Sequence, residues 1–114
     1  ASGNHSIMQL RARVLEVAGE LEASWQLTQE LIAANYLAPA TLMLYSRHAM
    51  RNQQQDRAIA LLENRLKAGG MSTMDTSGLY MSLASLFDSV GQYDNAFAHA
   101  KTGNDLRRPS AWCH

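Results

Sequence analysis

The sequence has little of what would cross-link, break or anchor a chain. It contains one cysteine, Cys113, which excludes an internal disulfide. Only two prolines interrupt it, and no segment alternates apolar and polar residues over the length of a strand. The longest stretch without a charged residue, 31–46, includes a proline and is shorter than the roughly 20 apolar residues that a membrane-spanning helix needs. We therefore predict no β-sheet and no membrane insertion.

Net charge is also missing, because ten basic and ten acidic side chains cancel. A chain without a positive field has no general attraction for nucleic acid, so we predict no nucleic-acid partner. Hydrophobic residues make up 46% and charged residues 18% of 114 residues, which is typical of one globular domain covering residues 1–114. There is no signal-peptide pattern, and we expect a cytoplasmic location.

Residues that favour helices dominate the sequence, mainly leucine, alanine, methionine, glutamine, glutamate and arginine. Apolar residues recur at intervals of three and four in six segments, as on one face of a helix. Gly69-Gly70 is a strong helix end, and Ser72 followed by Asp75 is typical of a helix start. The fold class is therefore all-α, with helices predicted at about residues 6–18, 21–36, 40–52, 56–68, 76–90 and 93–108.

A pattern of large and small residues recurs three times along the chain. The clearest copy reads Tyr80-x2-Leu83-Ala84-x2-Phe87-x3-Gly91-x-Tyr93-x2-Ala96-x3-Ala100 and is followed by Pro109. Weaker copies begin at Leu42 and Met8, so that Met8, Leu42 and Tyr80 are equivalent positions. Small residues come where the two helices of a pair must approach closely: Ala12, Ser46 and Ala84 on the first helix, and Ser24, Ala58 and Ala96 on the second.

This pattern resembles the motif of the tetratricopeptide repeat (TPR) family. The middle copy departs from it at Gln53, where a turn glycine is usual, and the first copy at Arg11, where leucine is usual. The resemblance implies a right-handed superhelical stack of three helix hairpins, with repeats at about residues 6–37, 40–70 and 76–109 and a short tail at 110–114. The alternative is an unrelated helical bundle, which would not need small residues at this interval.

The resemblance also implies a function, because the first helix of each TPR hairpin lines a concave groove that binds a polypeptide. The expected function is a non-enzymatic scaffold for a protein or peptide segment. Arg13 and Arg47 occupy equivalent places in successive repeats and would clamp a carboxylate, while methionines would supply adaptable apolar contacts. The alternative is that the methionines belong to the core and the charges only solvate outer faces. The predicted groove residues are Gln9, Arg13, Met43, Arg47, Met50, Met81, Ser85 and Asp88.

A second resemblance concerns the last copy alone. Leu79-Tyr80 and the segments 94–99 and 103–108 are similar to the repeat that often precedes the catalytic domain of bacterial TPR-containing sulfotransferases. It implies that the chain is the helical N-terminal or accessory part of a larger enzyme whose catalytic domain is absent from this sequence.

Motifs that carry catalysis or bind cofactors are not found. There is no phosphate-cradling glycine loop and no His-Glu-x-x-His. The four histidines lack metal-binding spacing, and Cys113 with His114 supplies only two ligands, fewer than a closed zinc site needs. We predict no catalytic residue, no cofactor and no metal.

The last repeat of a helical stack leaves an apolar face open unless something covers it. Only residues 109–114 follow the last predicted helix. We therefore expect the outer face of the last helix pair, near Phe97 and Trp112, to be covered by a sister chain, a downstream domain or the tail itself.

Overall fold

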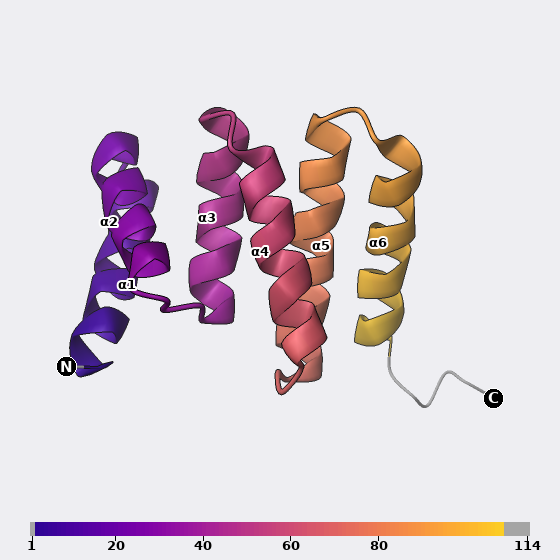
Figure 1. Cartoon of the computed structure of the whole chain (residues 1–114), viewed down its shortest axis with the longest axis horizontal. Coiled ribbons are helices and arrows are strands. Elements are labelled where there is room, and N and C mark those ends of the chain that lie inside the picture. The colour runs from indigo at the N-terminus through magenta and orange to yellow at the C-terminus, as the bar shows by residue number, and fades with distance from the viewer. Residues whose placement is uncertain (1, 109–114) are drawn as a thin grey trace.

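Six α-helices make up almost all of the computed structural model, which describes residues 2–108 and the side chains of residues 4–108 (Figure 1). Over this range the chain has no strand, so the all-α prediction is confirmed. Trp112, Cys113 and His114 lie outside the described residues. The helices are α1 (Ser2–Val17), α2 (Leu21–Ala33), α3 (Pro39–Arg51), α4 (Gln55–Ala68), α5 (Thr73–Ser89) and α6 (Tyr93–Arg107).

In Figure 1, α1 and α2 overlap at one end of the molecule, and α3, α4, α5 and α6 follow in chain order towards the other end. Each packs against the next, and in addition α1 packs against α3 and α3 against α5. Within residues 2–108 the even-numbered helices contact only odd-numbered neighbours, and neither α1 nor α2 contacts α5 or α6. The odd-numbered helices thus form a continuous layer in which α3 lies between α1 and α5.

The core runs along this series of helices. Its centre is a cluster of buried side chains from α2 to α6, which includes Leu42, Leu62, Leu83 and Phe87. The small residues expected at close helix contacts are all buried: Ala12, Ser24, Ser46, Ala58, Ala84 and Ala96. Their small volume allows the helix backbones to approach, which agrees with the role that the repeat pattern predicts for them.

The helix boundaries differ from the predicted ones mainly at three ends. α1 begins at Ser2 rather than near residue 6. α2 ends at Ala33 rather than near residue 36, because Asn35 has a left-handed backbone (φ 61°) that stops the helix. α5 begins at Thr73, and the Ser72 side chain accepts a hydrogen bond from the backbone N–H of Asp75 at 3.1 Å. The Ser72–Asp75 pattern therefore indicated the correct cap, although we placed the helix start near residue 76.

The turns inside the three helix pairs share one position with a left-handed backbone. Gly19, Gln53 and Gly91 occupy equivalent places in the three copies of the pattern, and all have a positive φ (84°, 61° and 82°). Only Gln53 has a Cβ atom, which makes this conformation unfavourable.

We expect Gln53→Gly to raise the free energy of unfolding by about 0.5–1 kcal/mol, because relief of the left-handed strain outweighs the extra freedom of glycine in the unfolded chain. Denaturant unfolding measures the change. The matched control is Gln26→Gly, at an exposed position inside α2, where glycine should destabilise by roughly 1 kcal/mol. Loss of stability in both variants would contradict the role assigned to this turn.

Candidate functional site

Five of the eight predicted groove residues line one hollow at the contact of α3 and α5, which we call the α3–α5 hollow. Its volume is about 300 Å³. The predicted members are Met43, Arg47, Met50, Met81 and Ser85, and the remaining wall is made by Ser46, Gly78, Ser82 and Arg107. The structure therefore brings together the three candidates from the second repeat and two of the three from the third.

The other three candidates lie elsewhere. Arg13 lines a separate hollow on α1. Asp88 lines a neighbouring hollow beside α6, which shares Met81 and Ser85 with the α3–α5 hollow. Gln9 is half-buried, and its side-chain nitrogen is buried without a hydrogen-bond partner among the described residues. Arg13 and Arg47 thus line different hollows.

The methionines lie both at the edge of the core and in the wall of the hollow. Met43 and Met50 are partly buried against the core cluster. Glycines make room for two of the sulfur atoms: a Cβ atom at Gly78 would lie 2.8 Å from Met43 Sδ, and one at Gly103 would lie 2.8 Å from Met81 Sδ. The methionines therefore contact the core with one part of the side chain and line the hollow with another, so the two interpretations do not exclude each other.

Arg47 already binds a carboxylate from its own chain. Its Nε donates to Glu16 Oε2 at 2.8 Å, and its Nη2 donates to Glu16 Oε1 at 2.9 Å. Arg51 Nη2 lies 3.9 Å from the same carboxylate. The hydrogen bonds from Arg47 hold the pKa of the Glu16 carboxyl below its usual range against the opposing effect of burial. A ligand carboxylate at Arg47 would have to displace Glu16.

Arg107 adds a guanidinium group to the α3–α5 hollow, and the sequence did not predict this residue there. Its Nε donates to Ser77 Oγ at 2.7 Å, and Ser77 Oγ donates to the Gly103 carbonyl at 2.7 Å. No described residue forms an ion pair with it. Because Arg107 lies in the last turn of α6, on the second helix of its pair, only the packing of α6 against α5 brings it to this surface.

A second unexpected feature is a fully buried polar pair between α2 and α3. Ser24 Oγ donates to the Ala12 carbonyl at 2.6 Å and lies 2.8 Å from His48 Nε2. Since the single hydroxyl proton is used on Ala12, His48 Nε2–H donates to Ser24, and His48 Nδ1 accepts from Arg51 Nη2 at 2.6 Å. Burial, reinforced by the charge of Arg51, lowers the pKa of His48, so the imidazole is neutral.

This pair does not form an activated nucleophile. In a serine hydrolase a carboxylate accepts the Nδ1 proton of the histidine, whereas here Nδ1 accepts a proton from an arginine. Both Ser24 and His48 are also fully buried, out of reach of a substrate. Their hydrogen bonds instead join the first helix pair to the second.

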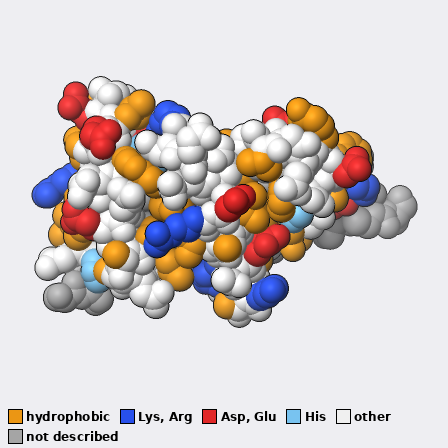
Figure 2. Space-filling model, turned by 45° about the horizontal axis from the view of Figure 1, so that its top comes forward, with side chains coloured by type: hydrophobic (Ala, Val, Ile, Leu, Met, Phe, Trp, Pro, Cys, Tyr) orange, Lys and Arg blue, Asp and Glu red, His pale blue; other side chains and the backbone are white. Residues whose placement is uncertain are grey.

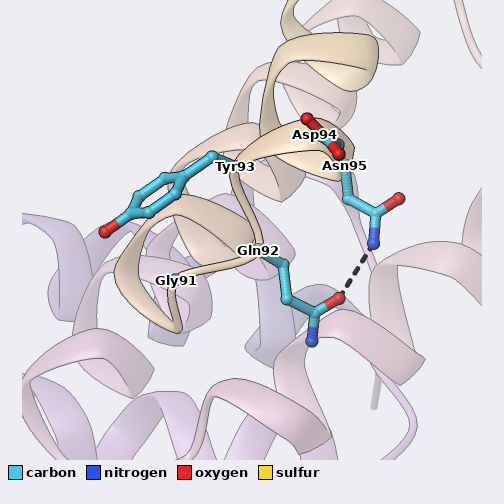
Figure 3. A pocket seen from close by; sticks show the side chains of 5 residues that line it. All are labelled: Gly91, Gln92, Tyr93, Asp94 and Asn95. Atoms are coloured by element: carbon cyan, nitrogen blue, oxygen red, sulfur yellow. Dashed lines mark hydrogen bonds between the residues drawn. The ribbon is translucent and has the colours of Figure 1, made fainter.

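The turn between α5 and α6 forms a hollow of about 370 Å³ from its own residues, 91–95 (Figure 3). Asn95 Nδ2 donates to Gln92 Oε1 at 2.8 Å, and the Tyr93 side chain extends away from both (Figure 3). No other element contributes a side chain to this hollow. The hollow therefore consists of the turn and the first residues of α6, and we do not consider it a candidate binding site.

On the face in Figure 2, acidic and basic side chains are interspersed with hydrophobic ones. Among the described residues no three histidine, aspartate or glutamate side chains gather as metal ligands would. None of the six described helices combines the length and apolar content that a bilayer crossing requires.

Comparison with models of known protein families gives no match, and comparison with curated protein sequences gives none either. The function must therefore be inferred from the repeat pattern and from the geometry of the α3–α5 hollow.

Proposed function

We propose that this chain is a TPR-like scaffold, a right-handed superhelical stack of three helix hairpins that binds a polypeptide segment and has no catalytic activity of its own. The order of helix contacts supports a stack, because each helix pair packs only on its neighbours in the chain. The buried small residues and the left-handed turn position, each present in all three pairs, support a repeat.

The composition of the α3–α5 hollow is the observation that carries the proposal. Met43, Met50 and Met81 offer a deformable apolar wall, Ser82 and Ser85 add hydroxyl groups, and Arg107 adds a guanidinium. This combination suits a segment with an apolar side chain next to a carboxylate, which Arg107 would bind. The volume of about 300 Å³ is at the lower limit of small-molecule pockets, roughly 300–1,000 Å³, which favours a segment lying across the surface.

Selection from a library of random displayed peptides tests this function. We expect enriched peptides to contain an apolar residue beside aspartate, glutamate or a free C-terminus. Arg107→Glu should weaken their binding by at least about tenfold and Arg107→Gln by less, because the amide keeps hydrogen-bond donors but loses the charge.

The matched control is Arg11→Glu, which makes the same charge change on an exposed part of α1 outside the hollow. It should leave peptide binding unchanged. Equal losses in Arg11→Glu and Arg107→Glu would mean that only net charge matters, and the absence of any enriched peptide would argue against a polypeptide-binding hollow.

The similarity of the last repeat to sulfotransferase-associated repeats stays a hypothesis about a larger protein. A reading frame that continues past His114 into a phosphosulfate-binding domain would support it.

A further inference from the structure

Both ends of the series of helices expose apolar side chains. On α1 the residues Ile7, Leu10, Val14 and Val17, which we call the α1 stripe, are 57–80% exposed. At the other end Tyr93 and Phe97 on α6 are also exposed. Three residues of the stripe, Leu10, Val14 and Val17, line a hollow of about 390 Å³ together with Arg13 and Ala18. The two surfaces lie at opposite ends of the helix series (Figure 1).

The repeat pattern shows what the α1 stripe is equivalent to. In the second copy the positions of Ile7, Leu10 and Val14 are occupied by Thr41, Leu44 and His48 on α3, and all three of these are fully buried. In the third copy the positions of Ile7 and Val14 are occupied by Leu79 and Leu86 on α5, which are fully buried as well. The difference is that α2 packs against α3 and α4 against α5, whereas no described helix precedes α1. The α1 stripe therefore has the form of a surface that receives an even-numbered helix.

The α6 surface is the complementary half. Phe97 is equivalent to Trp25 on α2, which is 8% exposed and lies 5.2 Å, ring centre to ring centre, from Tyr45 on the following helix. Phe97 itself is 74% exposed, because no described helix follows α6. It lines a hollow of about 390 Å³ together with Asp88, Tyr93 and the small residues Ala84, Ala96 and Ala100.

We propose that a second copy of this chain covers the α1 stripe with its own α6, so that copies associate head to tail. In this arrangement α6 of one copy packs on α1 of the next as α2 packs on α3. The proposal depends on the equivalence of repeat positions and does not require peptide binding. Met81 and Ser85 line both the hollow at Phe97 and the α3–α5 hollow, so the variants below are placed outside the α3–α5 hollow.

Charge complementarity supports this pairing. Within the chain, Glu16 on α1 pairs with Arg47 on α3. The position of Glu16 in the last repeat is occupied by Asp88, and the position of Arg47 in the first repeat is occupied by Arg13. Between the second and third repeats, Met50 occupies the position of Glu16 and Ser85 occupies the position of Arg47. Both residues line the α3–α5 hollow, which indicates that these two positions face each other between neighbouring repeats. A head-to-tail contact would therefore place Asp88 of one copy opposite Arg13 of the next.

Neither Asp88 nor Arg13 has an ion-pair partner among the described residues. Association of two α1 stripes would leave Arg13 without Asp88, and association of two α6 surfaces would leave Asp88 without Arg13. Only the head-to-tail contact brings these two opposite charges together.

The position equivalent to the buried polar pair would need no hydrogen bond in the new contact. Where α2 meets α3, the facing pair is Ser24 and His48, which satisfy each other. The equivalent positions between α4 and α5 are Ala58 and Leu86, both fully buried. Between copies they would be Ala96 and Val14, again an apolar pair that needs no hydrogen bond.

A head-to-tail interface does not close on itself in a dimer, so chains or rings should form. Sedimentation velocity from about 10 μM to about 1 mM should show a mass that rises beyond two copies as concentration increases. A monomer over the whole range would overturn the proposal and leave the α1 stripe for a helix of another protein.

Two variants with one end blocked determine the direction of the contact. Val14→Glu places a charge on the α1 stripe, and Phe97→Glu places one on the α6 surface; both positions are exposed, and circular dichroism checks the fold. We expect each variant alone to be monomeric and an equal mixture to form a dimer and nothing larger. Dimers of Val14→Glu alone would indicate contact between two α6 surfaces, and dimers of Phe97→Glu alone contact between two α1 stripes; either result overturns the proposal.

A charge exchange tests the predicted ion pair. Asp88→Arg should weaken association about tenfold or more, and adding Arg13→Asp in the same chain should restore it. Equal weakening in the single and double variants would overturn the assigned pairing of Asp88 with Arg13.

Discussion

Replacing Leu44 with alanine is expected to lower the free energy of unfolding by about 3 kcal/mol, whereas the same replacement at Leu10 should cost less than about 0.5 kcal/mol. The two leucines occupy equivalent positions in the first and second repeats. Leu44 is fully buried, so truncation removes apolar burial and leaves a cavity. Leu10 is 63% exposed, and alanine is the better helix former.

Denaturant unfolding at low protein concentration measures both effects without a contribution from association. At high concentration Leu10→Ala should also reduce self-association, because Leu10 belongs to the α1 stripe. If Leu10→Ala and Leu44→Ala lowered the free energy of unfolding equally at low concentration, the α1 stripe would already be covered within a single chain. The open-ended stack would then be wrong.

Periodicity was sufficient to predict six helices and their order. Local capping chemistry also contributed, since Ser72 with Asp75 and the Gly69-Gly70 pair both mark real helix ends. The end of α2 was predicted less well, because Asn35 takes a left-handed conformation that apolar spacing does not reveal. Helix ends depend on the dihedral angles of single residues, while helix existence depends on many residues together.

The candidate site was predictable only in part, for a related reason. Repeat positions assigned Met43, Arg47 and Met81 to one face, and the three side chains line the α3–α5 hollow. Residues at the same repeat position lie on the same face of successive helices. The pairing of Arg47 with Glu16 could not be predicted, since the two residues are far apart in the sequence and meet through packing between α1 and α3. The buried contact of His48 could not be predicted from spacing along its own helix, because its partner Ser24 lies on another helix.

Replacing Ser24 with alanine is expected to cost about 2 kcal/mol, because it leaves a buried N–H of His48 without an acceptor. The double variant Ser24→Ala with His48→Leu should recover most of this loss. It reproduces the Ala58 and Leu86 pair found at the equivalent positions between α4 and α5, where no polar group needs a partner. A double variant less stable than Ser24→Ala would show that the polar pair contributes more than the satisfaction of its own hydrogen bonds.

The same double variant should change how stability depends on pH. Burial, with the charge of Arg51 as the next cause, lowers the pKa of His48 from its ordinary value of 6.5, while Glu16 opposes the shift. Below pH 6.5, His48 therefore binds a proton in the unfolded chain but not in the folded chain. The free energy of unfolding falls as the pH drops from 6.5 towards the pKa of His48 in the folded chain. Glu16 adds a second loss below its ordinary pKa of 4.5, because its own pKa is also lowered by folding.

Unfolding curves measured from about pH 7.5 down to about 3.5 should separate the two groups, because their ordinary pKa values are well apart. In the double variant the His48 contribution to the loss just below pH 6.5 disappears, while the loss below pH 4.5 stays. Glu16→Gln should do the reverse, removing the lower loss and keeping the upper one. A double variant with the wild-type slope in the upper range would mean that His48 is not the group whose protonation opposes folding, and the buried link between the first two helix pairs would then have no role in acid sensitivity.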